Sequence, residues 1–298
     1  MKQLLVLSGK GGTGKTTVAA ALIRLARVHA FADCDVDAPN LHLLMSGAEI
    51  PACTTYYGLP KAMIDPTKCL SCGLCRKYCR FNAVEFKETK FHIRVSDCEG
   101  CGVCIRLCPT EAISLQPESA GELELFQQGK VFSTACLRMG QGTSGRLVTE
   151  VKKQLKRNME KEDLVILDGS PGIGCPVIAS LVGVDIVLMV AEPSVSGLSD
   201  MKRLVCSARQ FQIPMLVCTN KYDMNLKRAA AIETFCYGEN IPFLGGIPFD
   251  SKVIELVNRD MCIVDVPCNA GIAMEKIYRK ICKYLKEELS NDENCGGK

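Results

Sequence analysis

The sequence has few of the features that would direct a chain to a membrane, to nucleic acid or to a histidine-based metal site. No run of about 18 apolar residues occurs, so we expect no transmembrane helix and no stable membrane insertion. The formal net charge is only +3 over 298 residues, which gives no electrostatic reason to expect a nucleic-acid partner. The histidines are scattered without metal-ligand spacing, at His29, His42 and His92.

The cysteine content is high, with nineteen in the chain, and eight of these lie between Cys69 and Cys108. The first apolar run, residues 2–8, is shorter than a signal-peptide core and leads straight into a glycine-rich loop, so we expect a buried strand and a cytoplasmic protein. In a reducing compartment thiols stay unpaired, and clustered cysteines are then typical of metal sites.

Apolar runs of strand length alternate with helical patterns over most of the chain. Strands are expected at 2–8, up to 33, and at 130–135, 163–168, 185–191, 215–220 and 242–248. Helices are expected at 15–27, 144–159, after Gly197 and at 272–289. This alternation predicts an α/β fold, a mostly parallel sheet with helices on both faces. The long C-terminal helix has one apolar stripe, which favours docking on the domain over membrane contact.

One segment, residues 63–116, interrupts the alternation and is rich in cysteine. Its short hairpin-like stretches at 83–86 and 92–95 predict an inserted small α+β domain. We therefore expect a discontinuous domain at 1–62 and 117–290, the insertion at 63–116, and a disordered polar tail at 291–298.

The segment GKGGTGKTT matches the phosphate-loop pattern GxxxxGK[ST] between an expected strand and an expected helix. Its residues are the candidate ATP or ADP ligands: Gly9, Lys10, Gly11, Gly12, Thr13, Gly14, Lys15, Thr16 and Thr17. Backbone N–H groups of such a loop surround the phosphates. We expect Lys15 to contact the β and γ phosphates and the Thr16 hydroxyl to bind Mg²⁺, as in a P-loop NTPase; a glycine-rich turn that binds nothing is the alternative.

The second lysine of the loop, Lys10, gives a more specific resemblance. In this feature the chain resembles the deviant Walker A superfamily of P-loop ATPases, which includes MinD, the ParA ATPases, the nitrogenase iron protein and the Mrp-type cluster carriers. The resemblance implies that Lys10 acts in trans, across a nucleotide-sandwich homodimer or a dimer with a close paralogue, much as an arginine finger does. A solvated surface lysine is the alternative.

The stretch DCDVDAPNL resembles the first switch of that superfamily. The resemblance implies that Asp35 orients or deprotonates the attacking water, a role that Asp33 or Asp37 could share. Carboxylates that only solvate the end of a strand are the alternative for all three residues.

Three further positions match the same superfamily. Asp168 closes the run DLVILD before GSPGIG and resembles the Walker B aspartate, which implies that it holds Mg²⁺ through water. Asn220 in CTNKYD matches the base-reading asparagine, and the loop 247–250, which contains Pro248, is expected to line the adenine pocket.

The eight clustered cysteines form two CxxCxxCxxxC runs, the second followed by Pro109. In two-cluster ferredoxins the fourth cysteine of each run ligates the other cluster. The expected [4Fe-4S] ligand sets are Cys69, Cys72, Cys75 with Cys108, and Cys98, Cys101, Cys104 with Cys79. Zinc is the alternative metal. Arg80 stands where the first run would have its proline, and from this we expect a changed turn and a retained cluster.

Two cysteines outside the insertion, Cys136 and Cys175, fall where the nitrogenase iron protein has its cluster ligands. That resemblance implies a bridging cluster at a dimer axis, with Cys136 in the loop after an expected strand. Cys175 reads equally well as a small residue at the start of a helix.

The whole arrangement resembles a MinD-superfamily ATPase with an inserted ferredoxin domain. It implies an ATPase whose homodimerisation is coupled to electron transfer toward an unidentified redox partner. An iron–sulfur cluster carrier or scaffold, and a MinD-like or ParA-like positioning protein with redox-sensing clusters, are the alternatives.

Overall fold

The computed structural model describes residues 1–45 and 49–295, and the chain divides into two compact units. Unit 1 comprises Met1–Cys53, Glu124–Ala135 and Gly145–Lys298, and unit 2 comprises Thr54–Leu123 and Cys136–Ser144. Unit 2 includes all of the segment 63–116 and extends beyond it in both directions. No helix within the described residues is long and apolar enough to cross a membrane.

The strands of the main sheet are formed by runs of apolar residues whose side chains pack on both faces of the sheet. Its strands are β1 Lys2–Leu7, β2 Ala30–Asp33, β3 Ala52–Tyr57, β8 Ser119–Phe126, β9 Val131–Leu137, β10 Leu164–Asp168, β11 Ile186–Ala191, β12 Met215–Asn220 and β13 Phe243–Ile247. In the described part of the chain the order is β13-β12-β11-β1-β10-β2-β9-β8-β3, and every neighbouring pair from β13 to β9 is parallel. Three strands, β3, β8 and β9, have residues in both units.

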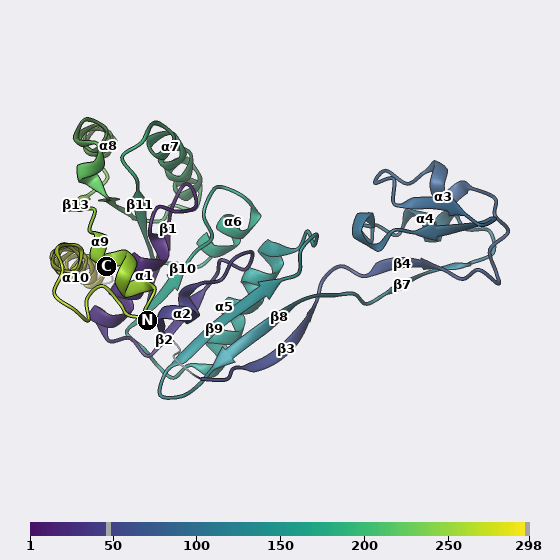
Figure 1. Cartoon of the computed structure of the whole chain (residues 1–298), viewed down its shortest axis with the longest axis horizontal. Helices are drawn as coiled ribbons and strands as arrows, with labels where there is room; N and C mark the ends of the chain where they lie inside the picture. Colours follow the sequence, from purple (N-terminus) through teal and green to yellow (C-terminus); the bar gives the residue numbers. More distant parts are fainter. Residues whose placement is uncertain (46–48, 296–298) are drawn as a thin grey trace. The chain divides into compact units, whose positions relative to one another are not determined.

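Helices cover both faces of this sheet, which confirms the predicted fold class (Figure 1). The helices of unit 1 are α1 Lys15–Ala26, α2 Leu41–Met45, α5 Ser144–Asn158, α6 Cys175–Leu181, α7 Val195–Gln210, α8 Leu226–Gly238, α9 Ser251–Val257 and α10 Asn269–Cys295, with a 3₁₀ turn, η2, at Tyr222–Met224. α1 packs against α10 on one face, and α6 and α7 contact β1 and β11 on the other. Parallel strands need such crossover helices, so both faces become buried.

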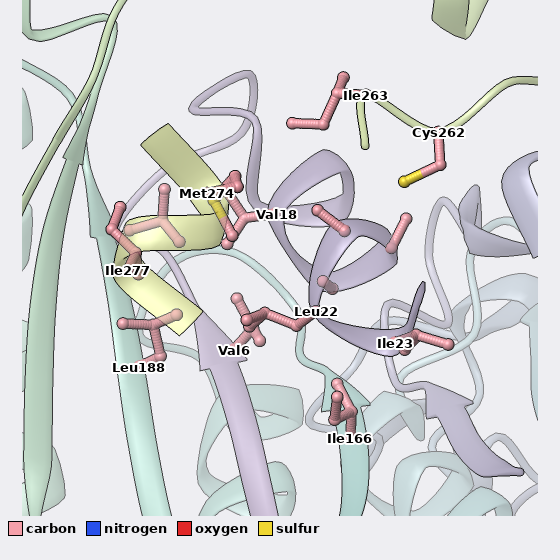
Figure 2. Close-up of a cluster of buried hydrophobic side chains, with 14 of the residues drawn as sticks. Val6, Val18, Leu22, Ile23, Ile166, Leu188, Cys262, Ile263, Met274 and Ile277 are labelled. Carbon is pink, nitrogen blue, oxygen red and sulfur yellow. The ribbon is translucent and has the colours of Figure 1, made fainter. Parts of the chain in front are cut away.

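The core under α1 and α10 shows why these sequences form helices. Figure 2 shows Val18 and Leu22 of α1 beside Met274 and Ile277 of α10, above Val6 of β1, and all five are at most 2% exposed. The spacing of the two α1 residues and the two α10 residues, four and three positions, places each pair on one helix face.

The expectation of a disordered tail at 291–298 is wrong for residues 291–295, because α10 continues to Cys295. No glycine or proline interrupts the sequence between Gly271 and Gly296, so nothing in the backbone ends the helix earlier. Residues 296–298 lie outside the described residues.

Unit 2 is a small α+β unit with an internal repeat. Its elements are β4 Lys61–Ile64, α3 Leu74–Lys77, β5 Val84–Lys87, β6 Lys90–Ile93, η1 Val95–Asp97, α4 Val103–Leu107 and β7 Ile113–Gln116. β4 pairs antiparallel with β7, and β5 pairs antiparallel with β6. Each short helix follows a left-handed glycine, Gly73 with φ 79° and Gly102 with φ 75°, so the two cysteine runs fold alike.

Candidate functional site

The phosphate loop joins β1 to α1 and packs closely against its surroundings. A Cβ on Gly9 would lie 2.5 Å from the Cβ of Asp200, and Gly12 and Gly14 have φ values of 79° and 86°. Only glycine adopts these conformations without strain, which leaves the backbone of the loop free to surround an anion at the start of α1. Its hydroxyl residues differ in exposure: Thr13 is buried, whereas Thr16 and Thr17 are half-buried.

Lys15 lies in the first turn of α1 and contacts the predicted Walker B residue. Its Nζ is 2.5 Å from Oδ1 of Asp168, and both side chains are buried. The other carboxylate oxygen of Asp168 is buried without a hydrogen-bond partner. A buried polar atom without a partner is unfavourable, so Asp168 retains an acceptor that a water or a hydrated cation could satisfy.

Three aspartates at the end of β2 have different environments, and these separate the roles that the sequence leaves open. Asp33 is fully buried, and its carboxylate accepts the backbone N–H groups of Asp35, Asn40 and Leu41. It therefore holds the shape of the loop 35–41, which the sequence predicts to be the first switch. Asp37 is exposed and Asp35 is half-buried, so Asp35 alone combines partial access with proximity to Lys15.

Electrostatics at this end of the sheet favour a bound cation. Burial, with the neighbouring carboxylate of Asp168, raises the pKa of Asp33 to about 7 against the opposing effect of Lys15. Burial also raises the pKa of Asp35, to about 6. Burial alone would lower the pKa of Lys15, but Asp168 and Asp33 outweigh it and the net pKa is raised. Three carboxylates thus surround one ammonium, and the excess negative charge suits Mg²⁺.

Lys10 contacts residues outside the phosphate loop. Its Nζ lies 2.8 Å from Oε2 of Glu192 and 3.3 Å from the hydroxyls of Ser194 and Ser196, between the end of β11 and the start of α7. Glu192 and the two serines carry no sequence motif, so sequence reasoning did not find them.

A cavity of about 290 Å³ lies beside the phosphate loop and contains the predicted base-binding residues. Asn220 and Pro248 line it together with Gly14 and Thr17. The Asn220 amide also donates to the carbonyl of Thr13 at 2.7 Å, which ties the end of β12 to the loop. Phe249, in the predicted loop 247–250, also lines it, whereas sequence reasoning missed the apolar lining residues that come mainly from α9: Val253, Ile254, Val257 and Ile263.

In unit 2, the eight clustered cysteines line two separate cavities. The first is lined by Cys69, Cys72, Cys75 and Cys108, and the second by Cys79, Cys98, Cys101 and Cys104. These are the two sets that the ferredoxin pattern predicts, each with its fourth cysteine from the other run. We call them the first and the second cysteine site.

Backbone N–H groups point at three of the sulfur atoms. The N–H groups of Ala62, Ala83 and Ala112 donate to the Sγ atoms of Cys98, Cys79 and Cys108 at 3.3 to 3.4 Å. Burial alone would raise the pKa of the Cys108 thiol, but the backbone N–H groups of Thr110 and Ala112 outweigh it, so the net pKa is lowered. Such donors favour thiolates, the form that ligates iron.

Within the described residues, no three His, Cys, Asp or Glu side chains converge closely enough to hold one metal ion. A [4Fe-4S] cluster takes one thiolate per iron at its corners, and four cysteines around each cavity are the donor set that such a cluster needs.

The turn after Cys79 is the same as the turn after Cys108, so the expected change at Arg80 is wrong. Asn82 donates to the carbonyl of Cys79, and Glu111 donates to the carbonyl of Cys108, at 3.5 and 3.3 Å. Asn82 and Glu111 both have φ 52°. Arginine can adopt the φ that proline fixes, and therefore the turn does not need the proline.

Cys136 lies within β9, not in the loop after it as expected, because the strand continues to Leu137. Cys175 is the first residue of α6, and both cysteines are exposed. The bridging cluster stays a prediction. Of the remaining described cysteines, five are buried core thiols: Cys34, Cys218, Cys236, Cys262 and Cys268.

Known proteins share this architecture. Uncharacterized protein MJ0578 of Methanocaldococcus jannaschii is 32% identical over 289 residues, which is 95% of this chain and 97% of that protein. An iron-sulfur cluster carrier protein of Pyrococcus abyssi is 24% identical over 314 residues, covering 98% and 88% of the two chains. The cell division ATPase MinD of Pyrococcus furiosus superimposes with a TM-score of 0.58 at 20% identity, covering 95% and 99%. The fold is that of a MinD-like P-loop NTPase.

The family model described as the CobQ/CobB/MinD/ParA nucleotide binding domain matches residues 4–264. This match includes the phosphate loop, the first switch, Asp168 and Asn220. The chain therefore belongs to the family of CobQ/CobB/MinD/ParA nucleotide-binding domains.

Proposed function

We propose that the protein binds and hydrolyses ATP with Mg²⁺, dimerises with a second copy of itself when ATP is bound, and couples these steps to electron transfer through two [4Fe-4S] clusters. The division of the eight clustered cysteines between two cavities supports the redox part of this proposal. Family membership and the phosphate loop support the nucleotide part.

In the nucleotide site the proposal gives each residue a separate role. Lys15 contacts the β and γ phosphates, Thr16 and Asp168 hold Mg²⁺, and Asp35 orients or deprotonates the attacking water. Lys10 of one protomer reaches the phosphates held by the other. The Lys15–Asp168 contact supports this assignment, because it brings the phosphate-binding lysine next to the metal-binding carboxylate.

In unit 2, the first and second cysteine sites each hold one cluster through four thiolates. A bound cluster supplies a reversible one-electron couple. Along the chain, α2 follows the proposed first switch, and the next element, β3, enters unit 2, so movement of the switch on hydrolysis has a covalent route toward the cysteine sites. The redox partner is a protein that exchanges single electrons with these sites.

Anaerobically purified protein tests the proposal. We expect about eight iron and eight sulfide per chain, four of each for one cluster, and Mg²⁺-dependent ATP hydrolysis. Redox titrations followed by EPR, with ATP, with ADP and without nucleotide, are expected to give different potentials or reoxidation rates. Lys15→Ala, which removes the phosphate contact, is the control that abolishes the nucleotide effect and retains the iron. Identical electrochemistry in all three nucleotide states contradicts the coupling.

A second function, delivery of clusters to other proteins, is favoured by similarity to iron-sulfur cluster carrier proteins. Four relatives of 22% to 24% identity are iron-sulfur cluster carrier proteins. Incubation of the iron-loaded protein with an apo-ferredoxin separates the two functions. Transfer of iron to the acceptor, accelerated by ATP, supports the carrier function, whereas full retention of iron supports electron transfer.

A further inference from the structure

Each cysteine site of unit 2 has a lysine that contacts the first cysteine of its run. Lys61 donates from Nζ to the backbone carbonyl of Cys98, and Lys90 donates from Nζ to the carbonyl of Cys69 at 3.3 Å. Cys69 and Cys98 occupy corresponding positions in the two CxxCxxCxxxC runs. The two ammonium groups are therefore equivalent in the repeat, one for each site.

The two lysines differ in burial. Lys61 is 6% exposed, whereas Lys90 is half-buried. The residues on either side of Lys61 contact the second site. The N–H of Ala62 donates to Sγ of Cys98 at 3.4 Å. Pro60 packs so closely on Gly100 that a Cβ added to Gly100 would lie 2.1 Å from the Pro60 carbonyl oxygen. Lys61 therefore has little freedom to turn toward solvent.

Lys61 has no counter-ion among the residues that the structure describes. No Asp or Glu carboxylate in that part of the chain lies within 4.0 Å of its Nζ, and the one acceptor recorded for its Nζ is the Cys98 carbonyl. Burial of an unpaired charge is strongly unfavourable. An anionic group held by Cys79, Cys98, Cys101 and Cys104 would supply the missing negative charge.

We propose that Lys61 is the internal counter-ion of the second cysteine site and raises its reduction potential above that of the first site. This inference rests on the two proposed clusters. Reduction takes one electron from a low-potential donor, makes the cluster one unit more negative, and forms or breaks no bond. A buried ammonium stabilises the more negative state more than a half-exposed ammonium does, because solvent screens it less.

The hydrogen bonds to sulfur do not separate the two sites. The second site accepts the N–H groups of Ala62 and Ala83, and Cys108 of the first site accepts the N–H of Ala112 and lies 3.8 Å from the Thr110 hydroxyl. Hydrogen bonds to the sulfurs are among the determinants of cluster potential, and because both sites have them, the burial of Lys61 is the difference that remains. An electron shared by the two sites therefore resides mainly on the second.

The test is an EPR-monitored titration with dithionite of the anaerobic full-length protein and of matched variants. Lys61→Met is expected to shift the oxidised-to-reduced ratio of the higher-potential cluster about tenfold toward oxidised, which is 59 mV for one electron. Lys90→Met, the control at the equivalent position, is expected to give a smaller shift, and on the lower-potential cluster. The Lys61 shift is expected to persist in 0.5 M NaCl, whereas the Lys90 shift is expected to fall.

Iron content separates the outcomes. If the wild-type protein binds no iron, the proposed function fails and not only this inference. If Lys61→Met retains its iron and both potentials are unchanged, the inference is overturned. If Lys61→Met loses iron, the Lys61→Gln variant, which keeps a hydrogen-bond donor without the charge, is measured instead. A lowered potential in Lys61→Gln supports the inference. Loss of iron in both variants overturns it in favour of an assembly role for Lys61.

Discussion

The contact between Lys10 and Glu192 leads to a quantitative prediction about dimerisation. If Lys10 acts across a dimer, it must first leave Glu192, Ser194 and Ser196 of its own chain. The Glu192→Gln substitution removes the charge and keeps the shape of the side chain. We therefore expect it to release Lys10 and to strengthen ATP-dependent dimerisation.

The magnitude follows from the geometry. The Nζ–Oε2 distance is 2.8 Å, but the lysine and glutamate side chains are 33% and 24% exposed, so solvent screens the pair. Measured exposed ion pairs contribute up to about 1 kcal/mol. A symmetric dimer releases two such contacts, about 2 kcal/mol together, which corresponds to a roughly 30-fold tighter dimer.

Sedimentation velocity over a range of concentrations, with a slowly hydrolysed ATP analogue, measures this change. Glu239→Gln is the matched control, because Glu239 pairs with Arg209 at 2.6 Å at the opposite end of α7. It is expected to leave dimerisation unchanged. Glu192→Gln is also expected to have no effect in a Lys10→Ala background. A weaker or unchanged dimer in the single variant would refute the argument that Lys10 must leave its own chain.

Three other predictions concern pH, helix capping and the phosphate loop. Because burial raises the pKa of Asp35 to about 6 and its ionised form is the active one, kcat/KM for ATP hydrolysis is expected to fall as pH decreases through about 6. Asp35→Asn is expected to lose at least about 100-fold in rate above about pH 6 and to remove this fall, so that the difference from the wild-type protein shrinks at lower pH. Lys152 donates to two carbonyls at the end of α6, at 2.8 and 2.6 Å. Lys152→Met is therefore expected to lower the free energy of unfolding by about 1 kcal/mol, which calorimetry would show as a Tm about 2–4 °C lower. An unchanged Tm contradicts the capping role. Gly9→Ala forces a Cβ to 2.5 Å from Asp200 and is expected to destabilise the protein by about 1–3 kcal/mol in urea, whereas Gly11→Ala, with open space around it, is expected to be neutral.

Much of the sheet could be predicted because its strands are continuous apolar runs. β1, β10, β11 and β12 are buried almost throughout, and they match the expected runs to within two residues. Two of the elements that were missed, α8 and β3, bury too little to leave a pattern. α8 buries only Ile232 and Cys236, and five of the six residues of β3 are exposed. Their positions depend on neighbouring elements, not on their own periodicity.

Part of the candidate site could likewise be predicted from the sequence, and part of it became clear only from the fold. The resemblance of the switch sequence assigns the catalytic role to Asp35 and leaves a shared role open to Asp33 and Asp37. The fold distinguishes these two from Asp35, because Asp33 is enclosed by the backbone of Asn40 and Leu41 while Asp37 faces solvent. Cys136 was expected in the loop after the strand, but it lies inside β9, because this strand extends two residues beyond the apolar run in the sequence.

The sequence by itself determined the phosphate loop and the two cysteine runs, because in these motifs a short spacing fixes the local backbone and the glycines that it requires. Tertiary structure alone decided what surrounds them. It brought Glu192 to Lys10, Asp168 to Lys15 and a buried Lys61 to Cys98, contacts between residues far apart in the chain. The physical reason is that spacing specifies which groups are present, whereas burial and the distance between charges, which set their pKa values and potentials, arise only when distant segments pack together.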